Sequence, residues 1–172
     1  LLHLSHLEKN VEQTNKKIYR VSLYRTIPQI KNLYQPLLEE KDIALDISIA
    51  NDFIESHISE EFLHIVLGNL LENAIKYSKI HSNIILFSKI DNRKLYFKIQ
   101  DFGCGIAKDE QEKIFQRFYR VDPSRNNKIK GNGLGLSIVK KMIENVNGNI
   151  SVESELQKGT TFLITIPITE KS

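Results

Sequence analysis

Alternating apolar and polar residues predict most of the strands in this chain. The stretch "DIALDISIAND" places Ile43, Leu45, Ile47 and Ile49 on one side, which is typical of a half-buried strand. Two further alternating runs, "SNIILFSKI" and "KLYFKIQD", are joined by "DNR" and predict a hairpin. A second hairpin is predicted in "GNISVESELQKGTTFLITIPI", and "NKKIYRVSLYR" allows another short strand near the start.

Apolar residues three and four apart predict the helices. The opening "LLHLSHLEKNVEQ" spaces Leu1, Leu4 and Leu7 three apart, which indicates an amphipathic helix. A helix that starts at the first residue suggests a cut through a longer helical element. A second helical pattern begins at Thr26, and Pro36 should kink that helix or end it early.

A long helix is predicted from Ser59 to about Ser78. Ser59 can cap its first turn, while Glu60 and Glu61 suit the positive end of the helix dipole. We also expect a short helix in "EQEKIFQRFYRVD", inside a long loop, and a helix after the glycines of "KIKGNGLGLSIVKKM". Because hairpins dominate, we predict an α+β fold: a two-layer sandwich in which helices cover one face of a mixed, mostly antiparallel sheet, preceded by a short helix.

Length and composition fit one domain with a short appendage. The 172 residues are 41% hydrophobic and 26% charged, and the net charge of +3 is too mild to imply nucleic-acid binding. No apolar run approaches the ~18 residues that would span a membrane. The single cysteine, Cys104, excludes an internal disulfide and fits a reducing compartment. Since the chain begins with Leu1 and has no signal-peptide pattern, we expect it to be a fragment of a longer protein.

A polar stripe crosses the long apolar helix. In "GNLLENAIKYS", the residues Asn69, Asn73, Lys76 and Tyr77 lie three or four apart and share one face. An asparagine oxygen is a neutral ligand that Mg²⁺ accepts when phosphate oxygens and water complete its octahedron. Lys76 would add a charge for phosphate, and Tyr77 a ring edge near a base or sugar. An ordinary solvated helix face is the alternative.

Two further motifs suit a purine base. In "QDFGCGI", Asp101 ends a strand, and its carboxylate can only accept hydrogen bonds, so it suits the exocyclic amine of adenine and repels the carbonyl of guanine. Gly103 and Gly105 would let the backbone approach the ring. In "QKGTTF", the Thr160 hydroxyl could reach the adenine directly or through a water shared with Asp101. Taken singly, the first motif is better explained as a tight turn with a capping aspartate, and the second as a hairpin turn.

The glycines of "KIKGNGLGLSIVKKM" precede a helix. Their G-x-G-x-G spacing matches neither a P-loop nor a dinucleotide-binding fingerprint. Bare backbone N–H groups at the positive end of a helix still suit a phosphate. A flexible loop before an ordinary helix is the alternative.

The order of the motifs is far more specific than any one of them. The chain carries N-x-x-x-N-x-x-K-Y, D-x-G-x-G, F-x-x-F, G-x-G-x-G-L and G-T-x-F in succession. This succession resembles the N, G1, F, G2 and G3 boxes of the sensor histidine kinase catalytic domain, a member of the GHKL ATP-binding superfamily, over roughly residues 21 to 168. The resemblance implies a GHKL (Bergerat) fold at 18–172 with a mobile lid at about 107–131. Residues 1–17 would be the C-terminal part of the second dimerisation helix and a linker.

The resemblance also implies roles for individual residues. Asn73 matches the magnesium-ligating asparagine, and Asn73, Lys76 and Arg120 would act on the transferred phosphoryl group. Arg120 is favoured among the lid cations for contact with the γ-phosphate. Asp101 matches the adenine-reading aspartate. The other positions expected to bind ATP are Asn69, Tyr77, Gly103, Gly105, Ile106, Phe115, Phe118, Lys130, Gly131, Gly133, Leu134, Gly135, Leu136 and Thr160.

Three functions remain open within this resemblance. GHKL ATPases carry a glutamate one helical turn before the magnesium asparagine, where this chain has Asn69. A neutral amide cannot take a proton from water, so phosphotransfer is favoured over hydrolysis. Glu72 faces about 100° away from Asn73 on the helix and is a poor substitute. The third possibility is an anti-sigma-like or pseudokinase module that binds a nucleotide or a partner without chemistry.

The phosphoacceptor is expected outside this chain, because no H-E-x-x-T-P type box occurs in it. We therefore predict that the chain binds Mg-ATP and cannot autophosphorylate alone. The resemblance implies transfer to a histidine on a dimerisation helix of the same or a partner subunit, and then to a response regulator receiver domain. It also implies a homodimeric full-length protein anchored in the bacterial inner membrane, with this domain in the cytoplasm. No nucleic-acid partner is expected.

Overall fold

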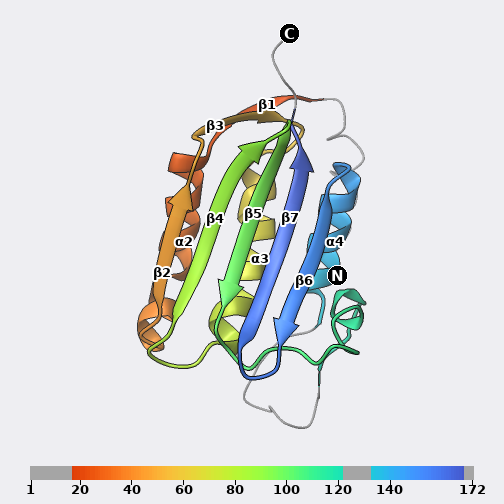
Figure 1. Cartoon of the computed structure of the whole chain (residues 1–172). Helices are drawn as coiled ribbons and strands as arrows, with labels where there is room; N and C mark the ends of the chain where they lie inside the picture. Colours follow the sequence, from red (N-terminus) through yellow and green to blue (C-terminus); the bar gives the residue numbers. More distant parts are fainter. Residues whose placement is uncertain (1–16, 122–132, 169–172) are drawn as a thin grey trace.

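A mixed sheet backed by helices forms the body of the domain (Figure 1). The computed structural model describes residues 17–121 and 133–168. Its five-stranded sheet has the order β2 (Ala44–Ile49), β4 (Asn83–Asp91), β5 (Lys94–Asp101), β7 (Gly159–Pro167) and β6 (Asn149–Glu155). Only the β2–β4 pair is parallel, and the other neighbours in this sheet are antiparallel.

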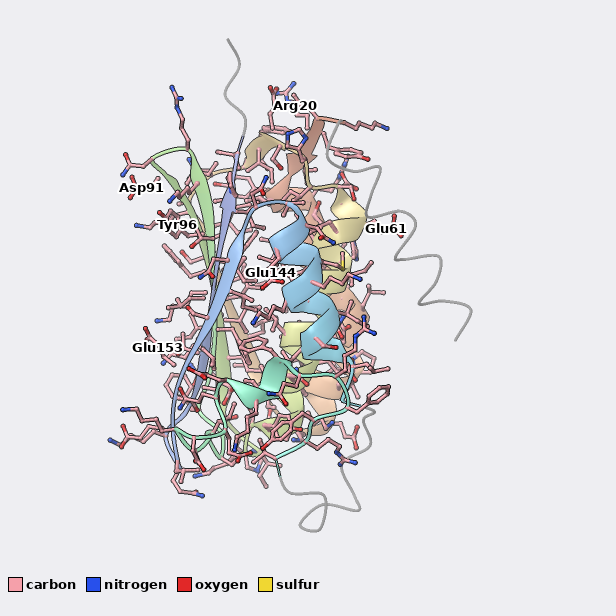
Figure 2. All side chains as sticks on the ribbon, turned by 90° about the vertical axis from the view of Figure 1, so that its right-hand side faces the viewer. Arg20, Glu61, Asp91, Tyr96, Glu144 and Glu153 are labelled. Carbon is pink, nitrogen blue, oxygen red and sulfur yellow. The ribbon has the colours of Figure 1, made fainter. Side chains whose placement is uncertain are left out.

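Three helices cover one face of this sheet: α2 (Leu23–Glu40), α3 (Glu60–Tyr77) and α4 (Gly135–Asn145). Figure 2 shows the two layers from the side, with Tyr96 and Glu153 on the sheet face that points away from the helices. The predicted α+β sandwich is confirmed. The first hairpin turns at Asn92 and Arg93, which both have positive φ, as a tight hairpin turn requires.

The core lies between the helices and the inner face of the sheet. Along β5 the inward residues Leu95, Phe97 and Ile99 are almost fully buried, and Asp101 is the next residue in the same inward row. The helices supply the facing layer, in which burial of each large apolar side chain stabilises the fold by about 1.5–3 kcal/mol. A carboxylate thus continues a row of core residues.

Helix α3 has the predicted bounds. Ser59 Oγ accepts a hydrogen bond from Phe62 N at 3.1 Å, and Glu60 and Glu61 occupy the first turn. At the other end, Lys41 Nζ donates to the carbonyl oxygens of Ile75, Lys76 and Ser78, at 2.8, 2.8 and 3.1 Å. A lysine from outside the helix therefore caps its last turn.

Helix α2 continues to Glu40, so Pro36 does not end it early, and the alternative expectation of a kink at Pro36 stays a prediction. Ile30 and Leu38 are buried on the two sides of Pro36, and this packing outweighs the loss of one backbone hydrogen bond. The helix also starts before Thr26, at Leu23, because the Ser22 hydroxyl caps it by accepting from Arg25 N at 3.2 Å.

The remaining elements are short. The expected strand near the start is β1 (Tyr19–Ser22), and it pairs with β3 (Phe53–Ser56), a strand that the pattern did not predict. The stretch expected to hold a short helix contains a 3₁₀ turn at Lys113–Phe115. The predicted opening helix lies outside the described residues. Within the described ranges, no helix has the length and apolar character needed to cross a bilayer.

Candidate functional site

A cavity of about 520 Å³ opens at the end of the two layers where β5 ends and β7 begins, at the bottom of Figure 1. Residues from α3, α4, both ends of the loop between β5 and α4, and the β6–β7 turn line it. A second hollow of about 440 Å³ lies near the end of α2 and includes Asp42 and His81. It contains none of the predicted site residues, so the larger cavity is the candidate site.

The predicted polar stripe of α3 faces this cavity. Asn69, Asn73, Lys76 and Tyr77 all line it, so the stripe is more than a solvated helix face. Partial burial lowers the pKa of Lys76, and the nearby Arg120 guanidinium lowers it further. These two cations make this part of the wall favourable for an anion.

Glu72 also lines the cavity, although its helical angle predicted that it would face away. Glu72 lies next to Asn73 on the exposed side of α3, and the cavity is wide enough to include it. The carboxylate of Glu72 slightly offsets the lowering of the Lys76 pKa, so the two charges interact.

Asn69 lies where α3 meets the first residue of α4. Its Nδ2 donates to Ile65 O at 2.7 Å, and a Cβ added at Gly135 would lie 2.7 Å from Asn69 Oδ1. A side chain at position 135 would therefore require the Asn69 amide to move. This packing gives the last glycine of the G-x-G-x-G run a role beyond exposing its backbone.

Asp101 is a buried carboxylate with one oxygen already bonded. Oδ1 accepts from Gly103 N at 2.9 Å and from Thr160 N at 3.3 Å. Within the described part of the chain Oδ2 makes no hydrogen bond, although Asp101 lines the cavity. Burial raises the pKa of Asp101, and the two backbone N–H groups partly oppose that rise by favouring the ionised form.

The loop after Asp101 lies tightly against the end of α3. A Cβ at Gly103 would come 2.1 Å from Tyr77 O, so no other residue fits there without moving the backbone. Cys104 N donates to Tyr77 O at 3.3 Å, and Gln157 N donates to Cys104 O at 2.8 Å. This loop therefore joins α3 to the β6–β7 turn across the cavity.

Several other predicted residues also line the cavity. These are Gly105, Ile106, Arg120, Gly133, Leu134, Gly135, Leu136 and Thr160. Lys130 and Gly131 lie outside the described residues. The predicted positions Gly103, Phe115 and Phe118 are described but are not part of the lining.

The two phenylalanines of the F-x-x-F motif have different surroundings. Phe115 packs edge-on against Phe162, with ring centroids 6.2 Å apart, so it anchors the loop to β7. Phe118 is 72% exposed, and its N–H donates to Gly133 O at 3.0 Å, which joins the two ends of the loop. Tyr119, which lines the cavity, donates its hydroxyl to the Glu110 carboxylate.

Sequence patterns missed part of the apolar wall. Ile114, Ile138, Leu156 and Phe162 line the cavity together with Cys104. Leu156 is 57% exposed in the β6–β7 turn. A leucine in a predicted turn is the sequence signal that could have identified it, because exposed apolar side chains often mark binding surfaces. The site thus combines an apolar wall, a buried carboxylate and cations, which suits a molecule with a flat ring and an anionic group.

The donor set for a metal is small in the described residues. They contain no group of three or more His, Cys, Asp or Glu side chains that could hold an ion. The Asn73 amide oxygen fits only a hard cation whose other ligands are phosphate oxygens and water.

Comparison with known proteins identifies the family. The family model for the histidine kinase-, DNA gyrase B- and HSP90-like ATPase matches residues 58–170, which include all described residues that line the cavity. The chain belongs to this ATPase family.

Individual members of the ATPase family are similar over most of the chain. The histidine-protein kinase ArlS of Staphylococcus epidermidis is 41% identical over 127 residues, which are 74% of this chain and 28% of ArlS. The catalytic domain of the histidine kinase ThkA is 27% identical, with a TM-score of 0.76 over 90% of this chain and 99% of that domain. Full-length ShkA in complex with AMPPNP is 25% identical, with a TM-score of 0.78 over 99% of this chain and 37% of ShkA.

The similarity defines a domain within longer proteins. The chain has the fold of the histidine kinase catalytic domain. It spans between 20% and 28% of the length of the first curated relatives that it matches.

Proposed function

We propose that the chain is the ATP-binding catalytic domain of a two-component sensor histidine kinase. In this proposal it binds Mg-ATP in the cavity beside α3 and donates the γ-phosphoryl group to a histidine on a dimerisation helix. The observation that carries it is the buried Asp101 carboxylate, which lines the same cavity as Asn73 and Lys76 in a member of this ATPase family.

Asp101 would read the base. Because two backbone N–H groups occupy Oδ1, Oδ2 remains to accept from the exocyclic amine of adenine. A 6-oxo group at that point would oppose a buried negative charge, so guanine is disfavoured. Ile106, Leu136 and Phe162 supply apolar surface for the ring.

The phosphates would lie near the start of α4 and the two cations. Leu134, at the N-cap of α4, provides no side-chain cap, so the N–H groups of the first turn can meet an anion. Lys76 and Arg120 add positive charge to the same cavity. ATP analogues fit a member of this fold, since ShkA was solved with AMPPNP.

Asn73 would hold Mg²⁺ through its amide oxygen, with phosphate oxygens and water as the other ligands. The ion would neutralise phosphate charge when bound. The protein's own residues orient the nucleotide and restrain the phosphates, which is the main catalytic requirement for in-line phosphoryl transfer.

Transfer to a side chain is favoured over hydrolysis by the route of the GHKL ATPases, whose water-activating glutamate is replaced here by Asn69. Asn69 donates to Ile65 O and lies against Gly135, so it packs two helices together and offers no basic group to water. The acceptor histidine would belong to the same or a partner subunit of a homodimer. A response regulator receiver domain would take the phosphoryl group, and the domain would lie on the cytoplasmic side of a membrane-anchored parent.

Isothermal calorimetry with ATP and GTP, with and without Mg²⁺, tests this proposal. We expect adenine-selective binding that tightens with Mg²⁺ in the wild-type chain. Asp101→Asn should weaken ATP binding by about 10- to 100-fold, because it replaces a charged acceptor by an amide and points an N–H donor at the amine.

Asp91→Asn is the matched control, because Asp91 lies at the opposite end of the β4–β5 hairpin (Figure 2) and does not line the cavity. This control should bind ATP like the wild type. Equal ATP affinity in the Asp101 variant would sink the assignment of adenine recognition.

A further inference from the structure

The hydroxyl of Ser154 lies directly behind a residue of the cavity wall. Ser154 belongs to β6 and pairs with Thr160 of β7 in the sheet. Its neighbour Glu153 points away from the helices in Figure 2, so by alternation Ser154 points toward them. Ser154 does not line the cavity, whereas Thr160 does.

Three groups surround the Ser154 hydroxyl oxygen. Ile106 N donates to it at 2.8 Å, and it donates to Gly159 O at 2.8 Å. The third group is Thr160 Oγ1, at 2.9 Å. The two partners other than Thr160 are a backbone donor and a backbone acceptor, so neither can reverse its role.

This arrangement determines the direction of the contact with Thr160. A serine hydroxyl carries one proton, and Ser154 gives that proton to Gly159 O. Thr160 must then donate its own proton to Ser154 Oγ. The Thr160 oxygen is left with acceptor lone pairs for any molecule in the cavity.

We infer that Ser154 is a positioning residue for base recognition: it orients the Thr160 hydroxyl so that the cavity presents an acceptor at that point. The inference rests on the proposed function, because it assumes that the cavity holds the base of ATP. Thr160 Oγ1 and Asp101 Oδ2 then form a pair of acceptors. A 6-amino group can donate directly to both of them, whereas a 6-oxo group has no proton to donate.

The main chain at Ser154 has a second support that does not involve its hydroxyl. Gln111 Nε2 donates to Ser154 O at 2.8 Å and to Ile106 O at 3.1 Å. Removal of the Ser154 hydroxyl therefore leaves the loop attached to β6. A substitution at Ser154 can change the direction of the Thr160 hydroxyl without releasing the loop.

The test compares ATP with inosine triphosphate, which carries an oxo group in place of the 6-amino group. Calorimetry on the 172-residue chain gives the ratio of the two affinities. In Ser154→Ala, Thr160 is free to donate into the cavity, so the ratio should fall about three- to tenfold, the equivalent of one hydrogen bond. Ser154→Thr keeps a hydroxyl and should restore the wild-type ratio.

A double-mutant cycle separates this role from a purely structural one. In a Thr160→Val background, Ser154→Ala should not change the ratio further, because the group that it orients is absent. Ser151→Ala, on the outward face of the same strand, should leave the ratio within about twofold of the wild type. Ser154→Cys, with a weakly bonding thiol, gives the same test if the alanine variant does not fold.

The possible outcomes are distinguishable. An equal loss of affinity for both nucleotides in Ser154→Ala, or a further change of the ratio in the Thr160→Val background, overturns the role of Ser154 alone. A wild-type chain that does not prefer ATP to inosine triphosphate overturns the proposed adenine recognition and this inference with it.

Discussion

At the scale of single residues, Asp101 combines two roles that normally exclude each other. It continues the inward row of Leu95, Phe97 and Ile99, yet it is a carboxylate at the wall of a cavity. Its burial raises its pKa, and only two backbone N–H groups oppose that rise. The carboxylate that is proposed to read the base is therefore one whose burial is unfavourable to its charged form.

This cost predicts how stability depends on pH. Because the folded pKa of Asp101 is raised, its contribution to stability is complete below the ordinary aspartate pKa of about 3.9 and is lost as the pH rises through the folded value. Asp101→Asn removes the charge and keeps an oxygen for Gly103 N and Thr160 N. At pH 8 we expect the Asp101→Asn variant to unfold at the same temperature as the wild type or at a higher one. Toward pH 4 the unfolding temperature of the wild type should rise relative to that of the variant.

Thermal unfolding followed by circular dichroism at both pH values measures this difference. Asp91→Asn again serves as the control, since Asp91 is an exposed residue of the hairpin. An Asp101 variant that unfolds well below the wild type at pH 8 would contradict the prediction.

At the scale of elements, the sequence patterns worked where a regular repeat extended over several turns or strand positions. Asn69, Asn73, Lys76 and Tyr77 lie on a well-capped helix, so their spacing translated directly into a shared wall. The patterns failed where tertiary contacts decided the outcome. Buried residues on both sides of Pro36 keep α2 continuous. Strand β3 has only four residues, which are too few to show an alternating pattern.

Loops were predicted least well for the same reason. Leu156 and Gln157 reach the cavity from a turn, where no repeat indicates which way a side chain points. Phe115 matched a motif, but its packing against Phe162 keeps it out of the lining. All of the nucleotide contacts and the magnesium ligation by Asn73 stay predictions, and Lys130 and Gly131 lie outside the described residues.

The C-terminal end of α3 gives a prediction at the same scale. Lys41 donates to three carbonyl groups there, beside Lys76 and Tyr77. Lys41→Met removes the cap and should lower the free energy of unfolding by about 1–3 kcal/mol. Since the last turn carries part of the cavity wall, ATP affinity should fall as well.

Urea unfolding and ATP titration measure the two effects of the Lys41 substitution. Lys94→Met is the control, because Lys94 is an exposed lysine at the start of β5. Lys41→Arg should recover most of the lost stability. Unchanged stability in Lys41→Met would mean that water replaces the lysine without loss.

At the scale of the whole molecule, the chain would supply the donor side of the proposed transfer reaction. Within the described ranges no histidine lines the cavity, and the sequence holds no H-E-x-x-T-P type box. The proposed kinase therefore requires a second element to receive the phosphoryl group.

The corresponding prediction is that the isolated chain binds ATP and stays unphosphorylated. Incubation with γ-labelled ATP and Mg²⁺, followed by a search for acid-labile label, tests it. Asn73→Ala is the control for signal that does not depend on the site. Label that appears on the wild-type chain and disappears in the Asn73 variant would contradict the prediction.

The position of β7 between β5 and β6 has a consequence for synthesis on the ribosome. Asn73 and Asp101 emerge early, but Thr160 emerges only with one of the last strands, which must enter the sheet beside β5. Insertion of a late strand into the middle of a sheet is a non-local step. Under the proposed function, the complete nucleotide site therefore forms only when translation of the domain is nearly finished, and ATP binding would report completed folding.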